Sequence, residues 1–154
     1  MKEIQLTQGK VALVDDEDYE YLSQWKWCAH VSRYTKTFYA MRNEKCKSVL
    51  MHRVIMNTPK GLLVDHVNHD TLDNRKSNLR NATVSQNGMN RNKTTNNTSG
   101  YVGVHFDSRR NKFVASIKKN TKLMFLGYFQ KIDDAILKRK EAESKYFGEY
   151  GINN

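Results

Sequence analysis

Cysteine and proline are scarce in this chain of 154 residues, which has two cysteines and one proline. Cys28 and Cys46 do not form a Cys-x-x-Cys pair, so the sequence predicts neither a disulfide framework nor a paired-cysteine zinc site. A zinc set that adds His30 and His52 to the two cysteines lacks the usual ligand spacing and is disfavoured. Two unpaired thiols suit a reducing cytosol.

Long apolar runs are also missing. The sequence has no run of about 18 apolar residues, the length that a membrane-spanning helix needs, and it shows no signal-peptide pattern. We therefore expect a soluble, non-secreted protein that has no membrane partner.

Positive charge, in contrast, is abundant and unevenly distributed. The chain has 26 Lys and Arg against 16 Asp and Glu, a formal net charge of +10. Residues 1–40 hold five basic and six acidic residues, residues 41–100 hold ten and four, and residues 101–154 hold eleven and six. A basic excess of this size indicates an anionic partner such as nucleic acid. The distribution indicates that the basic surface begins after about residue 40.

An Asp-His pair closes a short apolar run. The run at 62–64 reads as a strand that leads into Asp65 and His66, and a polar loop, a second short run at 79–83 and a helix start at 83–85 follow. Strand, loop, strand and helix form a scaffold that can hold one metal ion. Because neighbouring residues of a regular strand face opposite ways, we expect a bulge or a strand end at this pair.

The residue types suit metal-dependent hydrolysis of a phosphodiester. A hard divalent ion prefers carboxylate and amide oxygens, which makes Asp65 and Asn87 candidate ligands. Such an ion stabilises the leaving oxygen, and a histidine that titrates near neutral pH, here His66, can take the proton from water. In the alternative interpretation, the loop amides and carboxylates only satisfy turns, a role common for Asn68, Asp70, Asp73 and Asn74.

Residues 50–92 resemble the HNH nucleases, in the form common among phage and intron homing enzymes. The first motif position matches His66, the middle asparagine matches Asn78 twelve residues on, and Asn87 follows nine later, where the family often has histidine. The resemblance implies that Asp65 binds Mg²⁺ or another divalent ion such as Mn²⁺, and that Asn78 braces the loop carrying the base. It also implies a cytoplasmic protein of a bacterial or phage-infected host cell.

Three further residues near this motif carry open alternatives. The pattern around Met51-His52-Arg53 is similar to one that stands upstream of the Asp-His pair in the phage enzymes that this segment resembles. His52 and Arg53 therefore either support the metal site and contact phosphate, or only pack and face solvent. His69, in the polar loop, is a weaker candidate for a phosphate contact.

The segments on either side of the nuclease-like core differ in character. Residues 1–49 are expected to form a β-rich subdomain in which the acidic run 15–18 starts and caps a helix and residues 25–31 form a later strand. Its aromatic residues belong to the core rather than to a base-stacking surface. Residues 49–56 are expected to turn into a short helix that ends before Pro59. Residues 93–100 read as a linker. In the polar stretch 88–100, Arg91 and Lys93 either follow a DNA backbone or are two solvated charges.

Residues 101–150 are expected to form three strands, at 101–106, 112–118 and 123–128, and a helix over 132–147 with an apolar stripe at helical spacing. Residues 99–150 resemble the plant Apetala/ethylene-response-factor DNA-binding domain. The matching motifs are Ser-Gly-Tyr-Val-Gly-Val at 99–104, Leu-Gly-Tyr-Phe at 126–129, Ala135 and Lys-Tyr-Phe-Gly at 145–148.

That resemblance implies a sheet backed by the helix on one face, with the other face entering the major groove of double-stranded DNA. Leu123 departs from the family pattern, because relatives often have a basic residue there. The side chains expected on the DNA side are His105, Arg109, Ser116, Lys118 and Phe125, with Arg110 close by and Lys112 and Lys122 at phosphate.

The sequence thus predicts an α+β fold. An N-terminal antiparallel sheet leads into a ββα-metal core over 50–92, and a three-stranded antiparallel sheet packed on one helix follows. The predicted function is a sequence-preferring DNA endonuclease that acts as a monomer or homodimer. The alternative is a non-catalytic DNA-binding transcriptional regulator, although such a protein has no use for Asp65, His66 and Asn87 together. An RNA-binding or zinc-ribbon protein has little support.

Overall fold

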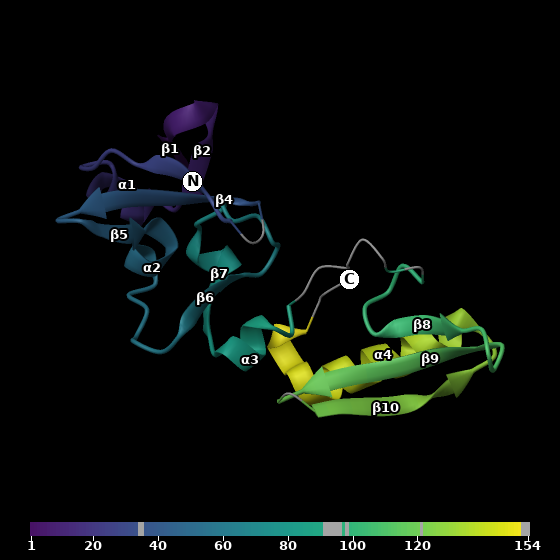
Figure 1. The fold of residues 1–154 in the computed structure, drawn as a ribbon. Helices are drawn as coiled ribbons and strands as arrows, with labels where there is room; N and C mark the ends of the chain where they lie inside the picture. The colour runs from purple at the N-terminus through teal and green to yellow at the C-terminus, as the bar shows by residue number, and fades with distance from the viewer. Residues whose placement is uncertain (34–35, 91–96, 98, 121, 152–154) are drawn as a thin grey trace. The chain divides into compact units, whose positions relative to one another are not determined.

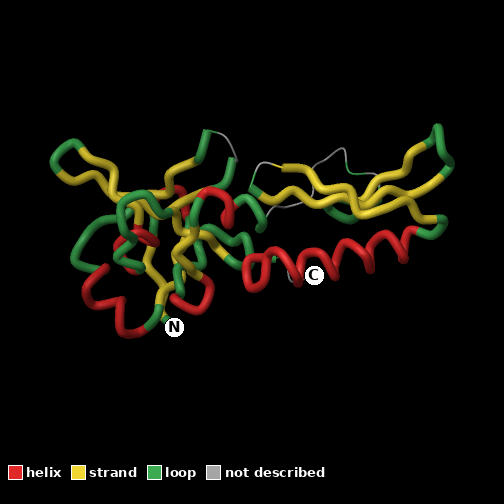
Figure 2. The backbone as a smooth tube through the Cα atoms, turned by 90° about the horizontal axis from the view of Figure 1, so that it is seen from below, coloured by secondary structure: helices red, strands yellow, loops and turns green. Residues whose placement is uncertain are grey.

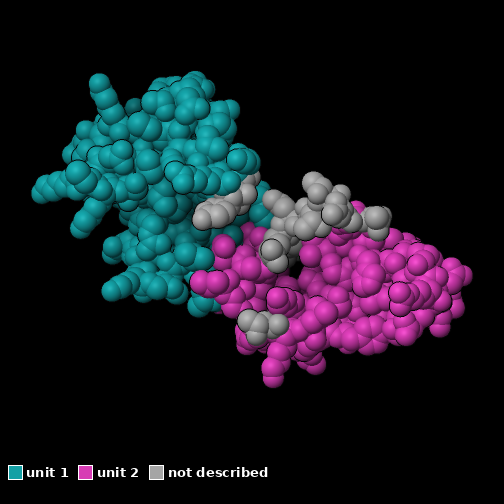
Figure 3. All heavy atoms as spheres, viewed as in Figure 1, with its two compact units in different colours: residues 1–83 teal, residues 84–154 magenta. Residues whose placement is uncertain are grey.

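The computed structural model describes residues 1–33, 36–90, 97, 99–120 and 122–151. The chain divides into two compact units, residues 1–83 and 84–154 (Figure 3). Helices and several small antiparallel sheets are combined in it, which confirms the α+β class in its coarser form. The first unit joins the predicted N-terminal subdomain to most of the predicted core. Among the described residues, no helix is long and apolar enough to cross a membrane.

The first unit begins with two small antiparallel layers. Strand β1 (Lys2–Gln5) pairs with β2 (Val11–Val14), with the short turn η1 (Thr7–Gly9) between them, and helix α1 (Asp16–Leu22) follows. Three strands then form a sheet in the order β3-β4-β5, with bounds Cys28–Val31, Phe38–Glu44 and Lys47–Leu50 (Figure 1).

One core holds these layers together. Its buried members come from both sheets, from α1 and from α2 (Met51–Ile55): they include Val14, Leu22, Trp27, Ala40 and Met51. Burying such side chains is the main favourable term in folding, at about 25 cal/mol per Å² of apolar surface. The aromatic residues Trp27 and Phe38 lie in or against this core, as predicted, whereas Tyr21 is 54% exposed and does not belong to it.

Two predicted boundaries in this region are wrong. A strand was expected over 25–31, but the strand begins only at Cys28. The reason is that Trp27 is buried and its indole Nε1 donates to the carbonyl oxygen of Leu22 at 2.8 Å, which ties the segment to the end of α1. A helix was expected to develop from Val49, but β5 continues through Leu50 and the helix begins at Met51.

The hairpin that carries the motif completes the first unit. Strand β6 (Leu63–His66) pairs with β7 (Leu79–Ala82), and the loop between them ends in the short turn η2 (Lys76–Asn78). These strands match the two predicted short runs. Helix α3 (Val84–Asn87) follows but belongs to the second unit.

The second unit is a sheet covered on one face by a long helix. The strand order is β10-β9-β8, with β8 at Val104–Asp107, β9 at Lys112–Lys119 and β10 at Lys122–Phe129. Helix α4 (Ile132–Phe147) runs along one face of this sheet, and the turn η3 (Gly148–Tyr150) follows it (Figure 2). Both the three strands and the helix were predicted, although β8 starts at Val104 rather than at residue 101.

A buried ion pair fixes the helix to the sheet. Arg139 Nε donates to Glu143 Oε1 at 2.7 Å, and Arg139 also donates to the carbonyl oxygen of Ser116. The Tyr101 hydroxyl donates to Glu143 Oε2 at 3.2 Å. Gly103 lies against this guanidinium at φ +80°, and a Cβ there would stand 2.6 Å from Arg139 Nη1. The close approach therefore requires glycine.

Candidate active site

Strand β6 ends on the Asp-His pair. Pairing with β7 is regular up to that point, with Asp65 opposite Arg80 and His66 opposite Leu79. Of the two expected solutions, a bulge or a strand end, the strand end is the one observed. Both side chains are 5 % exposed. Since consecutive strand residues face opposite ways, they have different surroundings.

Asp65 is held by an arginine on the neighbouring strand. Arg80 Nε donates to Asp65 Oδ2 at 2.8 Å, and Arg80 Nη2 lies 2.6 Å from the same oxygen. Directly opposite residues of an antiparallel pair are the ones whose side chains meet. The sequence reasoning missed Arg80, although the hairpin register would have paired it with Asp65.

His66 lies among other rings. Its ring centroid is 5.1 Å from that of His52 and 6.1 Å from that of Tyr39, and the Tyr39 and His52 centroids are 5.6 Å apart. Burial lowers the pKa of His66, although the Asn74 side chain and the carboxylates of Asp65, Asp70 and Asp73 act in the opposite direction. A lowered pKa keeps the imidazole neutral near pH 7, the form that can accept a proton.

The pKa of His52 is lowered to about 3, first by burial and then by the charges of His66 and Arg53. His52 is therefore also neutral near pH 7. Arg53 Nη1 donates to the Leu62 carbonyl oxygen at 3.0 Å, and its Nη2 donates to that of Thr58 at 3.5 Å. These bonds hold the segment between α2 and β6, and a phosphate contact by Arg53 stays a prediction.

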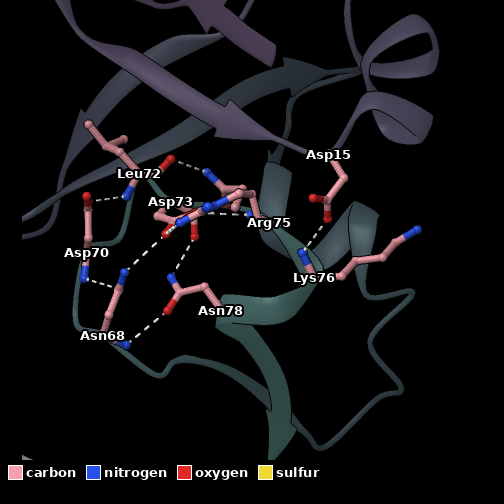
Figure 4. A network of polar contacts seen from close by, with 9 residues as sticks. Asp15, Asn68, Asp70, Leu72, Asp73, Arg75, Lys76 and Asn78 are labelled. Atoms are coloured by element: carbon pink, nitrogen blue, oxygen red, sulfur yellow. Dashed lines mark hydrogen bonds and ion pairs between the residues drawn. The ribbon is translucent and has the colours of Figure 1, made fainter. Parts of the chain in front are cut away.

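The loop between β6 and β7 is braced by Asn78 (Figure 4). Asn78 Oδ1 accepts from the Asn68 backbone N–H at 2.9 Å, and Asn78 Nδ2 donates to the Asp73 carbonyl oxygen at 2.8 Å. Asn68 Nδ2 also donates to Asp73 Oδ2 at 3.1 Å. One buried side chain thus connects the start of the loop to its middle.

Asp73, a turn residue in the alternative interpretation of the sequence, is a second fixed point of the loop. Arg75 donates to both of its carboxylate oxygens, from Nε and from Nη2, at 2.7 Å each. The hydrogen bonds from Arg75 hold the pKa of the Asp73 carboxyl below its usual value. Asp73 and its neighbour Asn74 are almost completely buried, so they do more than end a turn.

The β1–β2 hairpin and the residue after it also make hydrogen bonds to the β6–β7 loop. Leu13 donates its backbone N–H to Leu72 and accepts from the backbone N–H of Asn74, at 2.9 and 2.8 Å. Asp15 Oδ2 accepts from the Lys76 backbone N–H at 2.8 Å, as Figure 4 shows. Asp15 was expected to cap α1, but its side chain makes no capping bond. The carboxylate instead connects the N-terminal segment to the loop.

The remaining motif residues are less closely tied to the pair. His69 is half-buried in the loop at φ +65°, and its N–H donates to the His66 carbonyl oxygen at 3.1 Å. Asn87 is half-buried at the end of α3 in the second unit. The first unit therefore brings Asp65, His66 and Asn78 together, while a metal-binding role for Asn87 stays a prediction.

The oxygen donors suit an ion that takes most of its ligands from elsewhere. Among the described residues, no group of three or more His, Cys, Asp or Glu could hold a metal ion. Mg²⁺ is commonly bound by one or two carboxylates and completes its shell with water and substrate phosphate. Within the first unit, the single carboxylate of Asp65 fits that pattern, and its Oδ2 is also bound by Arg80.

Comparison with known proteins supports the nuclease-like reading of this hairpin. Residues 49–89 match the family model described as HNH endonuclease. The chain is 29% identical over 113 residues to an uncharacterized HNH endonuclease of Acanthamoeba polyphaga mimivirus. The match covers 73% of this chain and 58% of the relative, so the chain spans little more than half of that protein. No solved structure matches.

The predicted DNA-side residues lie on the second unit. In the β9–β10 register Leu123 is opposite Lys118 and Phe125 is opposite Ser116, so these four share a face, while the buried Ala115 and Ile117 face α4. His105 pairs with Val114 on the same outer face. Leu123 is 72% and Phe125 57% exposed.

The turn between β8 and β9 carries the two predicted arginines. Arg110 Nη1 lies 3.0 Å from Asp107 Oδ2, and its guanidinium stands 5.1 Å from the Tyr128 ring centroid. Arg109 is exposed, and its backbone N–H donates to Asp107 Oδ1 at 3.0 Å. Lys112 is half-buried and Lys122 is exposed. Arg91 and Lys93 lie outside the described residues.

Proposed function

We propose that this chain is a metal-dependent DNA endonuclease of the HNH type that hydrolyses a phosphodiester bond. The observation that carries the proposal is the buried imidazole of His66, next to Asp65 at the end of a strand, in a hairpin matched by the HNH endonuclease model. We infer that double-stranded DNA is the substrate. One site per chain would produce a nick if the protein acts as a monomer.

Each residue of the hairpin has a distinct task in this proposal. His66 takes the proton from the attacking water, because its neutral form predominates near pH 7. Asp65, oriented by Arg80, and Asn87 would hold Mg²⁺ or Mn²⁺. When bound, the ion stabilises the charge that develops on the leaving oxygen. Asn78 and Asp73 keep the loop after His66 in one conformation, so that the imidazole stays in place.

The outer face of the β8–β9–β10 sheet is the proposed DNA-binding surface. It combines the exposed cation of Lys118 with the apolar side chains of Leu123 and Phe125, and the exposed Lys122 lies at the start of the edge strand β10. Cations neutralise phosphates, and apolar groups can contact thymine methyl groups in the major groove. The sheet would supply sequence preference, and the first unit would supply the chemistry.

The decisive experiment is plasmid cleavage. Purified protein is incubated with supercoiled plasmid and Mg²⁺, with and without EDTA, beside the His66→Ala variant. We expect EDTA-sensitive nicking that falls by about 10²–10⁴-fold in the variant, the usual effect of losing a general base, with DNA affinity unchanged. Equal cleavage by both proteins would remove His66 as the base. Binding without any cleavage would favour a non-catalytic DNA-binding regulator.

A further inference from the structure

Three aromatic rings from three different elements meet at the Asp-His pair. Strand β4 contributes Tyr39, helix α2 contributes His52, and strand β6 contributes His66. All three pairs are edge-to-face, with interplanar angles of 69° for Tyr39 and His52, 65° for Tyr39 and His66, and 88° for the two histidines. Each ring therefore contacts both of the others.

The imidazole of a catalytic base needs such neighbours. The terminal torsion of a histidine side chain is broad, so the backbone and the first torsion do not fix the plane of the ring. A base nevertheless has to direct one nitrogen at its proton within hydrogen-bond reach. Groups packed against the ring are what restrict its orientation, and a well-defined site holds it within about 10–20°.

We propose that Tyr39 and His52 are positioning residues that hold the His66 imidazole in the orientation from which it acts. The inference rests on the proposed function, because it assigns these residues to the same reaction. It adds Tyr39 to the active site, a residue that lies before the segment that matches the family model, residues 49–89. The β3–β4–β5 sheet, which contains Tyr39, would then form one wall of the active site.

The surroundings of the two rings suit this role. His52 is 6 % exposed and is anchored in α2, where its carbonyl oxygen accepts from the Met56 N–H at 3.1 Å. Its low pKa keeps it uncharged, so it can pack edge-on without repelling the imidazolium that forms when His66 accepts a proton. Tyr39 is half-buried in the middle strand of its sheet, paired with His30.

The test compares variants that remove a ring with variants that keep it. Tyr39→Leu and His52→Leu remove a ring, whereas Tyr39→Phe and His52→Phe keep one and remove only the polar atoms. Tyr21→Leu is the matched control, because Tyr21 makes an edge contact of the same kind with Trp25, 4.8 Å between centroids, in another part of the first unit. The measurements are kcat and KM for plasmid nicking, the melting temperature, and ¹⁵N chemical shifts of the His66 imidazole.

We expect each leucine variant to lower kcat by about 10–100-fold with KM nearly unchanged, since small misplacements of a catalytic group cost up to about 10²-fold. The phenylalanine variants should recover most of that loss. The His66 ¹⁵N signals should broaden or move in the leucine variants and stay near the parent positions in the phenylalanine variants. Tyr21→Leu should leave kcat and these signals unchanged.

Three outcomes would overturn the inference. Leucine variants with parental kcat would show that the rings do not position the base. A Tyr39→Phe variant as impaired as Tyr39→Leu would assign the role to the hydroxyl. A raised KM with unchanged kcat would assign it to DNA binding. If one leucine variant does not fold, the kcat and ¹⁵N signals of the leucine variant at the other ring decide. Parental cleavage by His66→Ala would instead refute the proposed function itself.

Discussion

Replacing Asn78 by alanine tests whether the brace of the β6–β7 loop stabilises the first unit. The side chain is 5 % exposed and makes two bonds to backbone groups, with the Asn68 N–H and the Asp73 carbonyl oxygen. Removing one partner leaves the other unsatisfied, at about 1–3 kcal/mol for a buried group. The Asn68 N–H is only partly buried, so we assign about 1 kcal/mol to it and about 1–2 kcal/mol to the carbonyl. The expected loss is about 2–3 kcal/mol.

The assay can observe the first unit alone. Both tryptophans, Trp25 and Trp27, lie in residues 1–83, so tryptophan fluorescence during heating follows this unit. A loss of 1 kcal/mol shifts the melting temperature of a domain of 60–100 residues by about 4–8 °C. A loss of 2 kcal/mol should therefore lower the midpoint by about 8–16 °C.

The control is Asn43→Ala, an exposed asparagine of β4 with one long contact to Ser48 at 3.5 Å. Its effect should stay within about 0.5 kcal/mol, as for most surface substitutions. The cleavage rate of Asn78→Ala, measured where the protein is folded, should also fall, because the loop follows His66 directly. If Asn78→Ala and Asn43→Ala have the same melting temperature, the two bonds do not brace the loop and the reasoning is wrong.

Three other predictions concern the metal, the DNA surface and pH. Asp65→Ala and Asn87→Ala should each nearly abolish cleavage and weaken the response to Mg²⁺; a Mg²⁺ titration identical to that of the parent would remove that residue from the metal site. Lys122→Ala should make the slope of log affinity against log salt concentration shallower by about 0.9. Lys138→Ala should leave this slope unchanged, because Lys138 lies on α4 and pairs with Glu141 at 3.0 Å. Equal slopes for Lys122→Ala and the parent would show that Lys122 does not contact a phosphate. The pKa of His52 in the folded protein, about 3, is far below the usual value, so the stability that depends on its neutral form is present above pH 6.5 and is lost as pH falls toward 3. The melting temperature of His52→Phe, followed by tryptophan fluorescence, should therefore fall less between pH 6.5 and pH 4 than that of the parent. The same pH dependence in both proteins would contradict the lowered pKa.

Features set by local periodicity were predictable from the sequence. Helix α4 has the bounds expected from its apolar stripe, and it ends at Gly148, which has φ +53°. Strand β9 alternates between faces as its sequence does, with Ala115 and Ile117 buried against α4. The β6–β7 hairpin also lies where two short runs flank a polar loop. In each case the side chains that decide the element lie within a few positions of one another.

Features that depend on register or on distant packing were not predictable in this way. The Asp65–Arg80 contact exists because β6 and β7 pair with a particular offset, and a shift by one residue would turn Arg80 to the other face. The failed strand at 25–27 has a similar cause. The Trp-Lys-Trp alternation favours a strand, but burial of Trp27 and its bond to Leu22 outweigh that preference.

The division of labour within the first unit follows from these distant contacts. Sequence reasoning separated residues 1–49 from the nuclease-like core because their composition and charge differ. In the folded unit, Leu13 and Asp15 bind the loop that follows His66, and Tyr39 packs against His66 itself. A hairpin of two four-residue strands is only marginally stable alone, so its geometry has to be imposed by neighbours. We therefore expect the β1–β2 and β3–β4–β5 sheets to be required for catalysis rather than appended to it, because they belong to the same compact unit, residues 1–83, as the surroundings of His66.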